Sequence, residues 1–141
     1  MEIAIGSDHA GFELKEKVIL YLKSKNIHVL DKGCFSCERA DYPDYGHAVA
    51  NDVLKKHILG IVICGSGNGI NMSVNKHKGI RGALCWNSEV ASLARQHNDA
   101  NVMALPARFM NEEEAKKCVD AFVNEKFEGG RHQDRVLKID L

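Results

Sequence analysis

The sequence predicts a three-layer α/β/α sandwich, a doubly wound, Rossmann-like fold with a five-stranded parallel sheet. Apolar runs typical of strands alternate five times with segments of helical spacing, and only a few residues connect them. The run at residues 60–64 is apolar throughout, which is typical of a strand buried on both faces. The 141 residues show no internal repeat and no shift of composition, so we expect a single domain over residues 1–141.

The N-terminal half is expected to hold three strands and two helices. A short apolar run at residues 3–6 predicts the first strand, and apolar residues at helical spacing predict a helix over 12–22. Residues 27–30 predict the second strand. A polar, irregular stretch follows, then a helix over 43–57 that has a proline suited to its first turn, and then the strand at 60–64.

The C-terminal half continues the alternation. A short helix is expected over 70–74 and a fourth strand over 80–85. A helix over 88–97 leads into the fifth strand at 100–105, and the last long helix runs over 111–123. This order of elements completes the predicted sheet with helices on both of its faces.

The last two of these helices carry signals for their first residues. Ser88 is the candidate N-cap of the fourth predicted helix. Asn111 is the candidate N-cap of the next one, and Glu114 stands three residues later, as in a capping box. Both signals place helix starts where the hydrophobic periodicity also begins.

Charge and composition argue against several classes of protein. Lys and Arg together number 19, as do Asp and Glu, whereas a general nucleic-acid binder needs a basic excess. The apolar stretches are too short to span a membrane, and the first residues lack the cations of a signal peptide. The five cysteines are odd in number and too sparse for a disulfide scaffold. We therefore expect a cytoplasmic protein with reduced thiols.

Reactive side chains gather near three predicted strand ends. In doubly wound folds, ligands bind at the carboxyl ends of the strands. Residues 7–9, Ser-Asp-His, follow the first strand, and Cys64 ends the third and opens a glycine loop over 65–69. His97 and Asn98 lie between the fourth helix and the fifth strand. We expect the three segments to meet at one edge of the sheet, although each imidazole alone is as consistent with an idle surface residue.

Among these features, Cys64 and the glycine loop after it suggest the most specific chemistry. Successive small residues expose backbone N–H groups at a helix start, which suits an anion. A thiol in that position gains thiolate character and can act as a nucleophile or general base. The alternatives are that the loop is only a tight turn and that Cys64 is an inert core residue. Neither the P-loop nor the dinucleotide-binding fingerprint is met.

The C-terminal residues carry a pair of arginines. If this stretch is helical, Arg131 and Arg135 lie one turn apart on one face and can clamp a phosphate. The alternative is a solvated face without a ligand. Two glycines directly before the pair favour a mobile arm, from about residue 127, that reaches a second subunit.

Five motifs follow one another along the chain. They are GSDHAGF at residues 6–12, DYPDY at 41–45, CGSGNGI at 64–70, RQHNDANV at 95–102 and EGGRHxxR at 128–135. Together they resemble the type B ribose-5-phosphate isomerase family, which includes the galactose-6-phosphate isomerase subunits. The resemblance covers essentially the whole chain, and five ordered motifs are far more specific than any single glycine pattern.

The resemblance implies that D-ribose 5-phosphate and D-ribulose 5-phosphate interconvert through a cis-enediol(ate), a step of the pentose phosphate pathway, without cofactor or metal. By resemblance, Cys64 is the general base, His97 is the acid that opens the sugar ring, and Ser66 assists at the enediolate. The residues implied to bind substrate are Asp8, His9, Gly65, Gly67, Asn68, Gly69, Asn98, Arg108, Arg131 and Arg135.

The resemblance also implies a homodimer, or a dimer of dimers, with active sites at the subunit interface. Some family members carry a glutamate base just past the glycine loop, but residues 70–73 are Ile-Asn-Met-Ser, which leaves Cys64 as the candidate. The alternative substrate is a six-carbon sugar phosphate, allose 6-phosphate or galactose 6-phosphate. Two other classes stay open, a phosphate-binding module without catalysis and a thiol redox protein built on Cys34 and Cys37.

Overall fold

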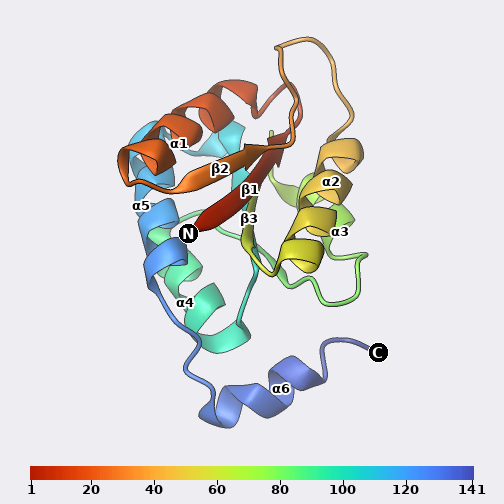
Figure 1. The fold of residues 1–141 in the computed structure, drawn as a ribbon, viewed down its shortest axis with the longest axis vertical. Helices are drawn as coiled ribbons and strands as arrows, with labels where there is room; N and C mark the ends of the chain where they lie inside the picture. Colours follow the sequence, from red (N-terminus) through yellow and green to blue (C-terminus); the bar gives the residue numbers. More distant parts are fainter.

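Five parallel strands form one sheet in the computed structural model, which describes residues 1–141 (Figure 1). Their order across the sheet is β2-β1-β3-β5-β4, so the chain winds first to one side of β1 and then to the other. This arrangement confirms the predicted doubly wound α/β fold. The strands are β1 (Glu2–Ser7), β2 (His28–Asp31), β3 (Leu59–Cys64), β4 (Gly82–Leu84) and β5 (Val102–Pro106).

Helices cover both faces of the sheet (Figure 1). On one face, α1 (Phe12–Ser24), α4 (Ser88–Asn98) and α5 (Glu112–Asn124) share one apolar cluster with the strands. On the other face, α2 (Tyr42–Lys56) and α3 (Asn68–Val74) form a second, smaller cluster. None of the helices combines the length and the apolar character needed to cross a membrane.

The inner strands β1, β3 and β5 are shielded on both faces. Ile61 and Ile63 of β3 pack into the cluster beneath α1, α4 and α5, whereas Val62 packs into the cluster beneath α2 and α3. Because successive side chains of a strand point to opposite faces, such a strand must be apolar at every position. The apolar run at residues 60–64 therefore predicted the centre of the sheet correctly.

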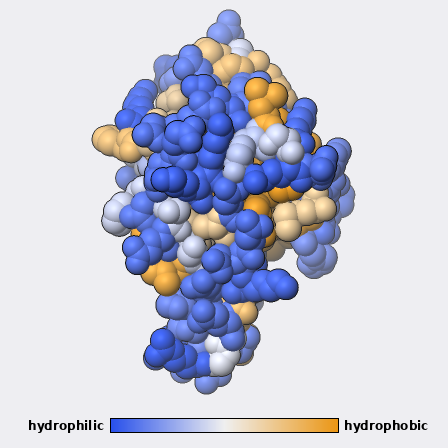
Figure 2. All heavy atoms as spheres, turned by 90° about the vertical axis from the view of Figure 1, so that its left-hand side faces the viewer, coloured by the Kyte–Doolittle hydropathy of each residue, from blue (hydrophilic) through white to orange (hydrophobic).

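The outer surface over α1, α5 and α4 is mostly hydrophilic, with scattered apolar atoms (Figure 2). This follows from amphipathic helices such as α5, which turns Cys118 and Phe122 toward the sheet and its charged residues toward water. The lower end of the same view is narrow. There the C-terminal residues stand apart from the two helix layers, as the 3₁₀ turn η2 (Gly130–His132) and the short helix α6 (Gln133–Leu137) (Figure 1).

Two helix starts differ in detail from the expectation. Asn87, rather than Ser88, caps α4, because its side-chain oxygen accepts a hydrogen bond from the N–H of Val90. Asn111 caps α5 as expected, at 2.8 Å from the N–H of Glu114. The Glu114 carboxylate closes no capping box; it accepts from the backbone N–H of Ser88 at 2.9 Å and ties the starts of α4 and α5 together.

A buried ion pair joins α1 to the end of β2. The ammonium of Lys15, which is fully buried, donates to both carboxylate oxygens of Asp31 at 2.7 and 2.9 Å. Asp31→Ala leaves this charge with only the half-exposed Glu16, 3.4 Å away. We expect the free energy of unfolding to fall by about 3 kcal/mol, the lower end of the range for a broken buried pair, as measured by urea denaturation.

Lys15→Met is the matched control for that prediction. It removes the buried charge itself and leaves Asp31 partly exposed to water, with its oxygen still accepting from the N–H of Gly33. The loss should therefore be smaller than for Asp31→Ala. Equal losses from the two substitutions would contradict the view that an uncompensated buried ammonium causes the destabilisation.

Candidate active site

A pocket of about 420 Å³ opens at the carboxyl ends of β1 and β3. Ser7 at the end of β1 pairs with Ile63, and Cys64 at the end of β3 pairs with Pro106 of β5, so three strands end together here. This is the edge at which doubly wound folds bind their ligands. The pocket is lined by Asp8, His9, Ala10, Tyr42, Cys64, Gly65, Ser66, Gly69, Arg108 and Phe109.

Cys64 forms part of the pocket wall. Its side chain is only 4% exposed, and its thiol is free, with no disulfide partner. Because it is the last residue of a central strand that is paired on both sides, its position is set by the sheet rather than by a loop. The sheet therefore fixes one thiol in the wall of an open pocket.

The glycine loop after Cys64 brings backbone close to the same pocket. Gly67 has a φ of +77°, and a Cβ there would lie 2.5 Å from Cδ1 of Leu84, so a side chain is excluded on two grounds. Ser66 is exposed, and its hydroxyl oxygen accepts from the N–H of Asn68 at 3.3 Å. The loop thus presents a hydroxyl and successive N–H groups next to the thiol.

Asp8 and His9, which follow β1, also line the pocket. Asp8 is nearly buried, and its carboxylate accepts from the N–H of Gly11 at 3.0 Å, which fixes the turn before α1. Nδ1 of His9 lies 3.2 Å from both the backbone nitrogen and the carbonyl oxygen of Ala40. These contacts hold the imidazole in place through one nitrogen and leave Nε2 for a ligand.

Arg108 lies against the glycine loop. It belongs to the 3₁₀ turn η1 (Ala107–Phe109), and its backbone N–H donates to the carbonyl of Gly65 at 2.9 Å. A Cβ on residue 65 would come within 3.1 Å of Nη1, so glycine at this position allows the guanidinium to approach. No carboxylate lies within 4.0 Å of the guanidinium, which leaves an uncompensated cation beside the pocket.

Tyr42 is a lining residue that sequence reasoning did not single out. It is the first residue of α2, and a Cβ on Gly69 would lie 2.5 Å from Cζ of its ring, so the ring rests on the loop. The signal was present in the DYPDY motif at residues 41–45, which supported the resemblance without a role for its tyrosine. Phe109 also lines the pocket, and it was missed because nothing in the local sequence points to it.

The expectation that all candidate residues meet at one edge of the sheet is wrong for a single chain. His97 lies in the last turn of α4, which leads into the amino end of β5. Just after α4, the carbonyl of Asn101 accepts a hydrogen bond from the N–H of Gly60. Because Gly60 lies near the start of β3, this contact places the end of α4 at the amino ends of the strands. Asp99 lines a hollow with Met1 at the beginning of the chain. A helix that precedes a parallel strand ends at that strand's amino end, opposite the Cys64 pocket.

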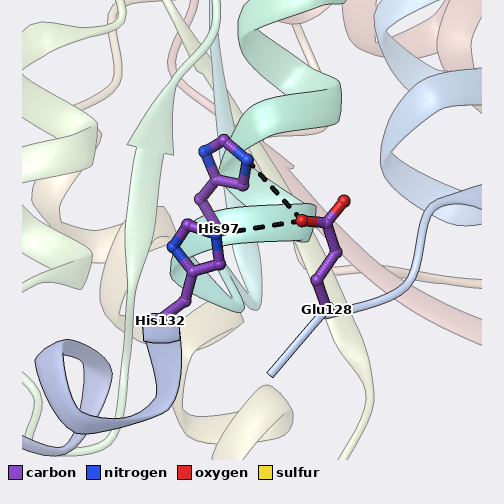
Figure 3. Close-up of side chains that lie close together, drawn as sticks. All are labelled: His97, Glu128 and His132. Atoms are coloured by element: carbon purple, nitrogen blue, oxygen red, sulfur yellow. Dashed lines mark ion pairs between the residues drawn. The ribbon is translucent and has the colours of Figure 1, made fainter. Parts of the chain in front are cut away.

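His97 instead meets residues of the C-terminal arm (Figure 3). Its ring stacks on that of His132, with centroids 4.2 Å apart and planes 13° from parallel, and Glu128 lies 3.8 Å from each imidazole. Partial burial lowers the pKa of His132, and the positive charges of His97 and of the two arginines add to this, against the opposing effect of Glu128. Asn98, Arg131 and Arg135 are exposed on this same side, away from the pocket.

The family model described as Ribose/Galactose Isomerase matches residues 3–139. The chain belongs to this family. The resemblance read from the five motifs is thereby confirmed, and the chain is a sugar isomerase of the Ribose/Galactose Isomerase family. The ribose-5-phosphate isomerase B of Escherichia coli K12 is 46% identical to it over 139 residues, which cover 98% of this chain and 93% of the relative.

Solved structures of Ribose/Galactose Isomerase relatives have the same fold over nearly the whole chain. A ribose 5-phosphate isomerase from Thermotoga maritima is 48% identical with a TM-score of 0.97, covering 99% of this chain and 97% of the other. A ribose-5-phosphate isomerase B from Mycoplasma genitalium with bound ribulose-5-phosphate is 45% identical with a TM-score of 0.94, covering 98% of this chain and 93% of the other.

The remaining cysteines of this Ribose/Galactose Isomerase member lie outside the pocket. Burial, which is the main cause for both, raises the pKa of the Cys85 and Cys118 thiols to about 12, so these two stay neutral in the core. The Cys34 thiol is buried and donates to the carbonyl of Ser36, whereas Cys37 is exposed. The family assignment favours an isomerase over the redox protein that these last two cysteines left open.

Proposed function

We propose that this isomerase interconverts D-ribose 5-phosphate and D-ribulose 5-phosphate through a cis-enediol(ate), without a cofactor. The observation that carries the proposal is the pocket that joins the Cys64 thiol to the uncompensated cation of Arg108. A carbon acid next to a carbonyl needs a base, and a phosphate needs a cation at a fixed distance from that base. The Mycoplasma genitalium relative with bound ribulose-5-phosphate supports this choice of substrate.

In the proposed reaction, the Cys64 thiolate takes the proton from C2 of the open-chain aldose. The electron pair of that C–H bond forms the enediolate double bond, and the carbonyl oxygen at C1 takes the negative charge. The N–H groups of the glycine loop and the Ser66 hydroxyl stabilise this oxygen, since preorganised donors act where charge develops. A proton then moves from the C2 hydroxyl to the oxygen at C1, which leaves the negative charge on the oxygen at C2. The same thiol returns its proton to C1 as the C2 carbonyl forms, which yields the ketose and regenerates the thiolate.

The phosphate is proposed to lie between His9 and Arg108. His9 and Arg108 both line the pocket, and neither Nε2 of His9 nor the guanidinium of Arg108 has a hydrogen-bond partner in the protein. A sugar phosphate carries close to two negative charges by analogy with phosphorylated side chains. The remaining proposed contacts come from the glycine loop and the turn before α1. They are Asp8, Gly65, Gly67, Asn68 and Gly69.

We propose further that the site is completed by a second copy of the chain. His97 and the two arginines of the arm lie at the amino edge of the sheet, whereas Cys64 lies at the carboxyl edge. In a two-fold dimer each copy can present its amino edge to the pocket of the other, so two complete sites form. His97 then protonates the ring oxygen during ring opening, Asn98 contacts a hydroxyl, and Arg131 and Arg135 join the phosphate site.

Conversion of ribose 5-phosphate to ribulose 5-phosphate by the purified protein in excess EDTA tests this function. We expect sustained turnover, because no step of the proposed reaction needs a metal ion. Allose 6-phosphate and galactose 6-phosphate are assayed beside it, and kcat/KM should be highest for the five-carbon substrate. Turnover of a six-carbon phosphate alone would change the substrate but keep the isomerase, whereas dependence on added metal would refute the cofactor-free mechanism.

A further inference from the structure

We propose that His97, Glu128 and His132 form a binding site for a divalent transition-metal ion such as Zn²⁺, and that the bound ion inhibits the enzyme. Two imidazole nitrogens and one carboxylate oxygen of these residues all lie within 4.8 Å of one another. Figure 3 shows the carboxylate beside the two stacked rings, with Oε1 3.8 Å from Nε2 of each. All three residues belong to the same chain.

The donor set and its spacing fit a tetrahedral ion with one open position. Two imidazoles and a carboxylate are a common set of protein ligands for Zn²⁺ where a water occupies the fourth place. With metal–ligand distances of about 2.0 Å, a tetrahedral ion holds its ligand atoms about 3.3 Å apart. The separations of 3.8 Å between Oε1 and each Nε2 are only slightly larger, and all three ligand atoms lie within 4.8 Å of one another, so the site closes if one imidazole moves toward the other two groups.

The movement that the site needs can come from the arm. The nitrogen lone pairs of an imidazole lie in the plane of its ring, and stacked rings hold them in two separate, nearly parallel planes, so one ring must turn for both to reach one ion. His132 follows Gly129 and Gly130, which both have positive φ and no atoms within 4 Å of a Cβ position, whereas His97 is held in α4. The N–H of Glu128 donates to the carbonyl of Gln96 at 3.0 Å, which keeps the carboxylate beside His97.

The nearby charges decide which ions bind. Arg131 and Arg135 flank His132 and repel any cation, and Glu128 supplies one negative charge to offset them. Binding must therefore come from coordination by nitrogen rather than from charge alone. Mg²⁺ and Ca²⁺ prefer sites made of oxygen ligands, so we expect them not to compete. The site should take Zn²⁺, Co²⁺ or Ni²⁺, which accept imidazole.

Inhibition follows if His97 is the acid that opens the sugar ring. A metal ion on Nε2 occupies the lone pair that would hold the proton, so the metal-bound imidazole cannot donate there. The arm is also held in place when His132 is a ligand, which restricts the approach of its arginines to a phosphate. This consequence rests on the proposed function, whereas metal binding itself does not.

Binding is tested by calorimetric titration of the full-length protein with Zn²⁺, and by the visible absorption of Co²⁺ added in its place. We expect one ion per chain. Glu128→Gln and His132→Asn should each weaken binding roughly ten-fold or more. The loss of a residue that only supports a ligand already has an effect of this size, and these two residues are themselves the ligands. His28→Asn is the matched control, because His28 is also an imidazole beside a glutamate, at 3.4 Å from Glu2, but it has no second imidazole.

Equal affinity of the wild type, Glu128→Gln and His132→Asn would overturn the metal site.

Inhibition is then measured as the loss of turnover on adding Zn²⁺, relative to the metal-free rate of each variant. Zinc should inhibit the wild type reversibly, with recovery in EDTA, and Glu128→Gln should need about ten-fold more zinc. Undiminished inhibition of Glu128→Gln would place the inhibitory ion elsewhere, for example on Cys64. A protein that binds zinc but turns over no sugar phosphate would contradict the proposed function and leave the metal site standing.

Discussion

Replacing Cys64 with alanine is expected to lower kcat for ribose 5-phosphate by roughly 10³-fold, within the range for loss of a general base. The thiol is the proposed base, since the segment after the loop has no acid, the Asp8 carboxylate is already tied to the N–H of Gly11, and His9 is assigned to the phosphate. KM should change little, because His9 and Arg108, the proposed phosphate ligands, are unchanged in this variant. Steady-state kinetics of the purified variant gives both values.

Two controls separate the loss of the base from a loss of structure. The thermal unfolding midpoint of Cys64→Ala should stay close to that of the wild type, since the substitution removes one sulfur atom at the edge of the core. Cys37→Ala removes an exposed thiol outside the pocket and should retain full turnover. If Cys64→Ala instead keeps turnover within about ten-fold of the wild type, another group moves the proton.

The fold was predictable because its signals are local. The run at residues 60–64 predicted a buried inner strand, and the alternation of strands and helices predicted a parallel sheet with helices on both faces. The order of the strands was not predictable in the same way. β5 lies between β3 and β4, so the chain crosses over its neighbour, and no local pattern records which strands pair.

The candidate site was predictable only in part. Cys64 ends a strand, and Ser66 and His9 each stand two residues after a strand end, so their common edge could be inferred. His97 was expected there too, but a helix leading into a parallel strand ends at the other edge. Tyr42 was missed because its place in the pocket depends on how α2 lies against the glycine loop, which the sequence does not record.

The contacts of the arm show the same limit. Glu128 and His132 stand one helical turn apart in the sequence, but their third neighbour, His97, lies more than thirty positions earlier. Only the packing of the arm against α4 brings the three together. From the sequence, the arm was interpreted as a pair of arginines, because two like charges at helical spacing form a local pattern. The cluster of His97 with Glu128 and His132 comes from two segments of the chain and forms no such pattern.

A heterodimer of Cys64→Ala with His97→Asn is expected to have about half the wild-type activity per dimer, although each variant alone is almost inactive. If the site combines one chain's pocket with the other chain's amino edge, one of the two sites has both substitutions and the other has neither. The heterodimer is isolated by coexpressing the two variants with different affinity tags and purifying on both. Turnover of ribose 5-phosphate is then compared with that of a doubly tagged wild-type dimer.

The matched control pairs the wild type with a chain that carries both substitutions. In this heterodimer each shared site has one substitution, so turnover should be almost lost. A site made from one chain reverses both results, because the wild-type chain then keeps a complete site and the first pair has none. The two heterodimers contain the same substitutions in the same number, so any difference between them comes from their distribution over the chains. Activity in the control and none in the first pair would therefore refute a site shared between subunits.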